Sequence, residues 1–96
     1  MTRANKAIQK KREAVAKGFA NHRRIEIMEL LVDQGEMMLE DIAKALDIQP
    51  ATASEHTQRL VRGGQVTKRY KGRHVLHRIT PLGRQCLRFL RIVVPQ

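Results

Sequence analysis

The sequence of 96 residues has few aromatic side chains and a single cysteine. With no tryptophan, one tyrosine and two phenylalanines, its core must be small and mainly aliphatic, which favours oligomerisation as a source of further burial. The lone cysteine excludes an internal disulfide and fits a reducing compartment. No stretch approaches the roughly 20 apolar residues that span a bilayer, and the basic N-terminus lacks the apolar segment of a signal peptide. We therefore expect one cytoplasmic domain, residues 1–96, without a membrane partner.

Acidic residues are absent from the C-terminal part of the chain. Residues 1–55 carry nine basic and nine acidic side chains, whereas residues 56–96 carry ten Lys or Arg and no Asp or Glu, which accounts for the net charge of +10. Uncompensated basic charge indicates a polyanionic partner, with nucleic acid first and an anionic membrane surface second; the membrane surface is disfavoured because the apolar face of the N-terminal helix is small and broken at Lys11 and Arg12. A solubilising surface is a weaker explanation, because such surfaces usually mix both signs.

Apolar spacing and local stop signals predict five helices, over residues 3–18, 22–34, 39–46, 50–62 and 81–93. Asn21 and Thr80 are expected to act as N-caps, and Asp47 to adopt a left-handed conformation. Residues 65–80 change to a period of two around Gly72, which predicts a β-hairpin. A short helix, a tight turn, a second helix and a hairpin form a winged helix-turn-helix, a mainly α (α+β) fold.

The same periodicities predict which side chains face the core. In the fourth helix the inward positions are Ala53, Thr57, Leu60 and Val61. In the hairpin the apolar contacts are expected from Val66, Tyr70, Val75 and Ile79. In the last helix the apolar stripe consists of Leu82, Cys86, Phe89, Leu90 and Val93.

The stretch "QPATASEHTQRL", residues 49–60, is the first candidate functional site. It is compatible with a helix that reads nucleic acid, a catalytic pocket or a solvated helix face. Glu55 and His56 diverge by roughly 100° on a helix, so they do not form an acid–base pair. The short polar side chains on the outward face can instead approach base edges, and the cations can hold phosphates. The candidate DNA-binding residues here are Gln49, Thr52, Ser54, Glu55, Gln58, Arg59 and Arg62.

The hairpin is the second candidate site, because cations surround its turn. They are Lys68, Arg69, Lys71, Arg73 and Arg78. We expect Lys71 and Arg73 to contact DNA, with Arg73 suited to a narrow minor groove. The alternative is an exposed hairpin whose lysines prevent edge pairing, and both interpretations can hold together.

Metal, cofactor and enzyme sites are not indicated. His74 and His77 are three apart on a predicted strand and point to opposite faces, so they do not chelate one ion. Cys86 lies in an apolar stripe, as expected of a buried inert thiol. The glycines in "VRGGQV" fall between a helix and a strand, the wrong order for a phosphate-binding loop.

The segments "NHRRIEIMELL", "IAKAL", "TASEHTQRL" and "KGRHVLHRIT" occur in the order and spacing of a known family. Residues 19–90 resemble the winged-helix repressors of the ArsR family, and "TPLGRQCLRFL" is similar to the last helix of MarR-like regulators. The resemblance implies a dimeric transcriptional regulator whose fourth helix enters the major groove and whose hairpin follows the backbone into the minor groove. It also implies a dimer interface built by the terminal helices, residues 3–18 and 81–93.

Several positions depart from the family pattern. Met38 and Glu40 stand where metal-sensing members carry a Cys-x-Cys pair, and residues 81–93 contain neither His nor carboxylate, so neither known type of metal sensor is expected. Thr57 occupies a usually aliphatic position, and Gln49 stands where a better capping Ser is common. The sequence identifies no effector ligand.

The N-terminal helix has two interpretations. It either clamps a second subunit through apolar residues while its lysines face DNA, or it is a partly disordered basic arm. The sequence as a whole predicts a homodimeric repressor that binds specific double-stranded DNA and is not an enzyme. The alternative is a winged-helix module for protein–protein assembly without DNA binding, docking through the acid-rich residues 26–47.

Overall fold

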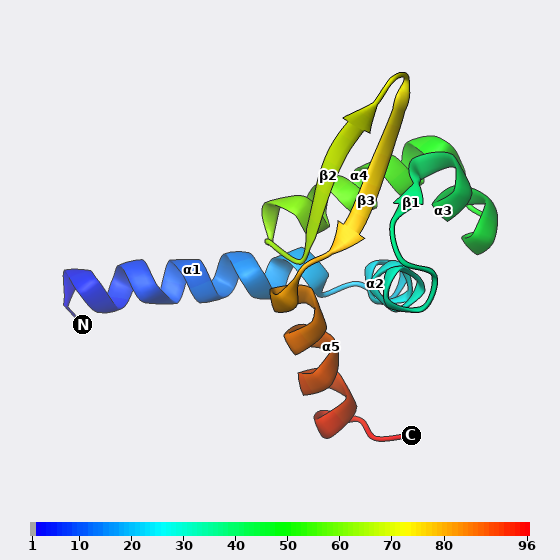
Figure 1. Cartoon of the computed structure of the whole chain (residues 1–96). Helices are drawn as coiled ribbons and strands as arrows, with labels where there is room; N and C mark the ends of the chain where they lie inside the picture. The colour runs from blue at the N-terminus through cyan, green and yellow to red at the C-terminus, as the bar shows by residue number, and fades with distance from the viewer. Residues whose placement is uncertain (1) are drawn as a thin grey trace.

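The computed structural model describes residues 2–96, which form five helices and three strands (Figure 1). The helices are α1 (Arg3–Phe19), α2 (His22–Gln34), α3 (Leu39–Leu46), α4 (Pro50–Arg62) and α5 (Pro81–Val93). The strands are β1 (Met37–Met38), β2 (Val66–Lys71) and β3 (His74–Ile79). These bounds confirm the five helices and the hairpin that the sequence predicted. Among residues 2–96, no helix combines the length and the apolar character needed to cross a membrane.

Local capping interactions fix the helix-turn-helix. The side chain of Asn21 accepts hydrogen bonds from the backbone N–H groups of Arg23 (2.9 Å) and Arg24 (3.2 Å), so α2 begins directly after it. Asp47 adopts the left-handed conformation (φ 54°, ψ 50°) that ends α3, as predicted. Pro50 is the first residue of α4, where its missing N–H costs no helical hydrogen bond.

The sheet has one strand more than the hairpin that the sequence predicted. Its order is β1-β3-β2, all antiparallel, with Met37 paired to His77 and Val66 paired to Ile79. The added strand β1 has two residues, which is too short to show a period of two in the sequence. It ties the base of the wing to the segment that leads from α2 into α3.

The core lies where α2, α3 and α4 meet the base of the sheet. Its buried members include Ile27, Met28, Leu31, Ile42, Leu60 and Val66. The prediction for Tyr70 was wrong, because its side chain is 70% exposed on the distal part of β2. In α5 the buried residues are Gly83, Cys86 and Leu87, whereas the predicted stripe residues Phe89 and Val93 are each 57% exposed. The stripe along α5 is therefore wider than this chain alone can cover.

The helix α1 extends away from the body in Figure 1, and its C-terminal end is held by an unanticipated residue, Gln65. The Gln65 side chain is fully buried, and its Nε2 donates to the carbonyl oxygen of Val15 in α1 (3.0 Å). A Cβ at Gly18 would lie 2.8 Å from the Cα of Gly63 at the end of α4. Two facing glycines thus let α1 and α4 pack closely, so α1 is a helix over residues 3–19 that is anchored at its C-terminal end, while residues 3–14 are exposed.

Candidate nucleic-acid interface

The outward face of α4 is polar and accessible over its whole length. Thr52, Glu55 and Gln58 are exposed, while Ala53 and Leu60 are fully buried on the opposite side, as predicted. Ser54 is half-buried at the edge of the face, and its Oγ accepts a hydrogen bond from Nε2 of Gln58 (3.2 Å). The helix therefore presents hydroxyl, carboxylate and amide groups over residues 52–58, and the short side chains at its start let it approach a surface closely.

The two departures from the family pattern have clear structural consequences. Thr57 is 1% exposed, and its Oγ1 donates to the carbonyl oxygen of Ser54 (3.0 Å), so the buried hydroxyl is satisfied within the helix. Gln49 is the exposed N-cap residue of α4, and its side chain makes no capping hydrogen bond. The helix start thus relies on Pro50, while the Gln49 amide is free to contact a ligand.

The wing carries exposed cations at its tip. Lys71 and Arg73 flank Gly72, whose positive φ of 61° provides the turn between β2 and β3. Arg69 differs from them because its guanidinium is bound by the carboxylate of Glu36, with Nε 2.8 Å from Oε2. This pairing was not predicted, and it removes Arg69 from the cations that are free to bind phosphates.

A shallow cleft of about 150 Å³ separates α4 from the wing. Its walls include Ser54 and Gln58 from α4 and Lys68 and Tyr70 from β2. The ammonium of Lys68 lies 5.9 Å from the centre of the Tyr70 ring, within the range of a cation–π interaction. The exposed Tyr70 therefore faces the same cleft as the candidate reading residues, a role that its apolar strand position concealed in the sequence.

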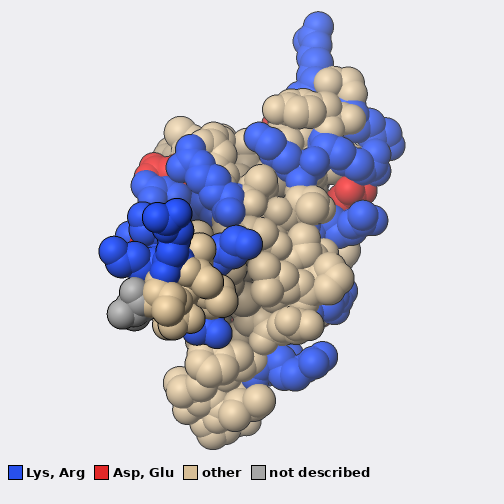
Figure 2. Space-filling view, turned by 90° about the vertical axis from the view of Figure 1, so that its left-hand side faces the viewer, with Lys and Arg blue, Asp and Glu red and all other residues tan. Residues whose placement is uncertain are grey.

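Further cations gather where the C-terminal end of α4 meets α1. Arg59 and Arg62 are exposed and line a groove together with Lys17. Beside them, Nη1 of Arg24 donates to the carbonyl oxygens of Lys17 (3.0 Å) and Gly18 (3.1 Å) and so caps the end of α1. Burial, and then the neighbouring charge of Arg59, lowers the pKa of Arg24. Figure 2 shows Lys and Arg over α1 and over the wing, with the α5 end mostly free of them.

The histidines and the cysteine are arranged as expected for structural side chains. His77 is 3% exposed and His74 is exposed, so the two do not converge. Within residues 2–96 no group of three metal-binding side chains occurs. Burial lowers the pKa of His77 and raises the pKa of the Cys86 thiol, which favours an unreactive protonated thiol. His56 is half-buried, and burial followed by the charge of Arg24 lowers its pKa.

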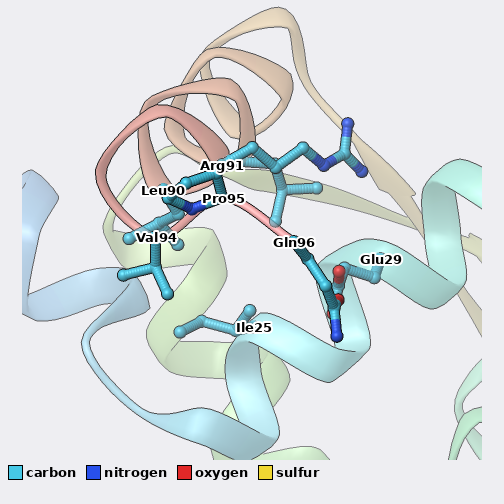
Figure 3. Close-up of a pocket in the computed structure, with 8 residues that line it drawn as sticks. Ile25, Glu29, Leu90, Arg91, Val94, Pro95 and Gln96 are labelled. Carbon is cyan, nitrogen blue, oxygen red and sulfur yellow. The ribbon is translucent and has the colours of Figure 1, made fainter.

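A larger pocket of about 550 Å³ lies between α2 and the C-terminal end of α5, away from the outward face of α4 (Figure 3). In the close-up, Val94 and Ile25 point toward each other across it. Its lining includes Ile25, Glu29, Leu87, Leu90, Arg91 and Val94. The exposed apolar residues Phe89, Ile92 and Val93 of α5 do not line this pocket.

Comparison with known families and proteins supports the same arrangement. The model of the IclR helix-turn-helix domain matches residues 22–69, which run from α2 into β2. The HTH-type transcriptional regulator Rv0324 of Mycobacterium tuberculosis is 43% identical over 65 residues, which are 68% of this chain and 28% of that protein. The chain thus spans less than a third of the length of this curated relative.

Solved structures share the whole fold. The crystal structure of a 1–100 fragment of a possible transcriptional regulatory protein from Mycobacterium bovis has a TM-score of 0.85 and 34% identity, covering 94% of this chain and 97% of that one. The solution structure of the fragment Mb0332 from the same organism has a TM-score of 0.85 and 33% identity, covering 97% and 86%. That fragment is described as the homodimeric winged helix-turn-helix DNA-binding domain of a possible ArsR-family regulator.

Proposed function

The chain belongs to the winged helix-turn-helix transcriptional regulators, and we propose that it is a homodimeric repressor that binds a specific site in double-stranded DNA. The observation that carries this proposal is the exposed polar face of α4 beside a cationic wing. In this fold the second helix of the helix-turn-helix enters the major groove, and dimers bind two related half-sites. Occupation of such a site by a compact dimer excludes other proteins from it, which is the simplest form of repression.

The proposed base contacts come from residues 52–58 of α4. The Thr52 and Gln58 side chains can contact base edges, and the Glu55 carboxylate can accept a hydrogen bond from a cytosine amino group. Ser54 contributes mainly by orienting Gln58, since its Oγ already accepts from Nε2 of that residue. Gln49 is close enough in sequence to the helix start to contact a base or a phosphate beside it.

The proposed contacts to DNA phosphates come from the C-terminal end of α4 and from the tip of the wing. Arg59 and Arg62 lie on the last turns of α4, and Lys71 and Arg73 lie at the wing tip. All four side chains are exposed, so they can pair with phosphates without breaking internal contacts. These contacts supply affinity that depends on salt, whereas the reading helix supplies sequence preference.

The proposed dimer interface uses the terminal helices, as the resemblance to the ArsR family implies. Ile8 of α1 is 45% exposed, and Phe89 and Val93 of α5 are each 57% exposed. A second copy that covers these side chains would bury apolar surface that a single chain leaves in water. The homodimeric state of the similar Mycobacterium bovis fragment supports a dimer.

The test is selection of bound duplexes from a random-sequence library, followed by affinity measurements at several salt concentrations. We expect a near-palindromic site whose half-sites are about one helical turn, roughly 10 base pairs, apart. Affinity should fall linearly on logarithmic axes as salt rises. A dimer that selects no sequence, or whose binding is insensitive to salt, contradicts the proposal. Absence of binding to any duplex at low salt would instead favour a protein–protein assembly module.

A further inference from the structure

The helix α1 has two distinct faces, and its cations are concentrated on one of them. The exposed residues Arg3, Lys6, Lys10 and Lys17 are spaced by three, four and seven positions, which places them on one side of a helix. Ala4, Ile8, Val15 and Phe19 follow the same type of spacing on another side. The two series are out of step, so these four cations and the apolar side chains lie on different sides of the helix, while Lys11 and Arg12 border the apolar side.

Grooves on either side of α1 identify which neighbours each face meets. The groove beside the basic face is lined by Ala14, Lys17, Arg59 and Arg62. The basic face therefore continues directly into the cations at the C-terminal end of the reading helix. On the other side, Val15, Ala16 and Phe19 line a separate apolar hollow that contains no residue of α4.

Internal pairing leaves most of the basic face available. Within residues 2–96, the ion pairs include Lys17 with Glu13 at 3.8 Å but none that involves Arg3, Lys6 or Lys10. Lys6 and Lys10 are also one turn apart, and like charges at this spacing repel each other along a helix. A row of unpaired cations that works against helix stability is explained when an external polyanion neutralises it.

We propose that the basic face of α1 binds DNA phosphates located between the two half-sites. This inference rests on the proposed function. If a second copy covers the apolar face of α1, the two α1 helices lie beside the two-fold axis, between the reading helices. From Lys17 to Arg3 the face is about 21 Å long, at about 1.5 Å per residue, which is enough to follow several phosphates. The central DNA would then be held without any base contact.

The experiment compares Lys10→Gln with its matched control Lys11→Gln, on the operator selected from the random library. Both substitutions remove one charge from neighbouring positions of α1, but Lys11 lines the apolar hollow and not the basic face. The salt slope of binding should fall by about 0.9 per lost phosphate contact, hence by about 1.8 for the two copies of Lys10 in a dimer. Lys11→Gln should leave the slope unchanged. Sedimentation must first establish that both variants remain dimers.

A second arm changes the DNA instead of the protein. In a duplex whose phosphates between the half-sites are neutral methylphosphonates, the unmodified protein and Lys10→Gln should bind with the same salt slope. Equal slopes for Lys10→Gln and Lys11→Gln on native DNA, or no effect of the neutral phosphates on the unmodified protein, would overturn the inference while leaving operator binding intact. Failure to select any operator would contradict the proposed function itself.

Discussion

Arg69 on β2 and Glu36 before β1 form a two-pronged salt bridge, with Nε 2.8 Å from Oε2 and Nη2 2.7 Å from Oε1. Hydrogen bonding to Arg69 lowers the pKa of Glu36, and the same contact raises the pKa of Arg69. The bridge spans the sheet from its outer strand to the loop after α2. One of the wing cations is therefore neutralised within the chain, and it anchors the wing instead of extending its positive surface.

This bridge predicts that removing both of its charges has little effect on DNA binding. The double variant Glu36→Gln with Arg69→Gln should show the same salt dependence of DNA binding as the unmodified protein, because the ion pair carries no net charge. Arg73→Gln should lower the slope by about 0.9 per protomer, since Arg73 is exposed at the tip. Fluorescence anisotropy at several salt concentrations measures both. A double variant that loses as much slope as Arg73→Gln would contradict the assignment of Arg69 as an anchor.

Gln58 and Arg62 lie on the same helix and should affect binding in different ways. Gln58→Ala is expected to relax preference at one position in each half-site, with discrimination changing by about 1–3 kcal/mol. Arg62→Gln should weaken all sequences to a similar degree, because a phosphate contact carries no base information. Competitive binding to single-base operator variants distinguishes the two. Uniform weakening by Gln58→Ala would show that α4 docks in another orientation.

Thr57 predicts an effect on stability rather than on binding. Its hydroxyl bonds only to the Ser54 carbonyl, which also belongs to the helical ladder, so Thr57→Val should cost less than about 1 kcal/mol in the free energy of unfolding. Thr57→Ala removes buried methyl packing and should be less stable than the valine variant. Urea unfolding measures both. A valine variant that loses clearly more than about 1 kcal/mol would mean that the hydroxyl has a role beyond its local hydrogen bond.

The helix bounds were predictable because their signals are local. The Asn21 and Thr80 caps, Pro50 at the start of α4 and Asp47 at the end of α3 each act within a few residues of the chain. The outward face of α4 followed from the same logic, since a period of 3.6 residues sets it once the helix is placed.

The features that could not be predicted from the sequence all depend on residues that are distant from each other in the chain. The strand β1 exists because Met37 pairs with His77, and Arg69 is neutralised because Glu36 lies across the sheet. In the sequence, Gln65 is a polar residue at the start of a predicted strand, where an exposed side chain is ordinary. In the structure it is fully buried between α1 and α5, with Nε2 3.9 Å from Cys86 Sγ. No local sequence pattern indicates these pairings, so they could be identified only from the three-dimensional structure.

His77 predicts that stability depends on pH below neutrality. Burial lowers its pKa in the folded protein, while the unfolded chain keeps the ordinary value of about 6.5. The unfolded state therefore binds more protons as the pH falls through this value, and the free energy of unfolding should decrease from pH 7.5 to pH 5. His77→Gln should reduce this dependence relative to the unmodified protein and leave the part that comes from half-buried His56, whereas the control His74→Gln, on the same strand but exposed, should retain it. Equal dependence in all three proteins would exclude His77 as the source.

The close contact between Gly63 and Gly18 predicts that a larger residue at position 63 lowers stability and weakens dimerisation. Gly63 has φ −77° and ψ −8°, which alanine adopts without strain, so the backbone itself tolerates the substitution. A Cβ there would nevertheless lie 2.8 Å from the Gly18 Cα and press on the Gln65 side chain. Gly63→Ala should thus displace α1 from α4 and lower the free energy of unfolding by about 1–3 kcal/mol.

The control is Gly35→Ala, because a Cβ at Gly35 meets no atom within 4 Å and its positive φ of 81° imposes only a local cost. Both variants should lose stability in urea unfolding, but only Gly63→Ala should also shift sedimentation toward the monomer, since α1 carries part of the proposed interface. The distinction follows from geometry: one glycine permits two helices to touch, and the other permits a turn. Unchanged dimerisation in a destabilised Gly63→Ala protein would mean that the position of α1 against α4 does not govern assembly.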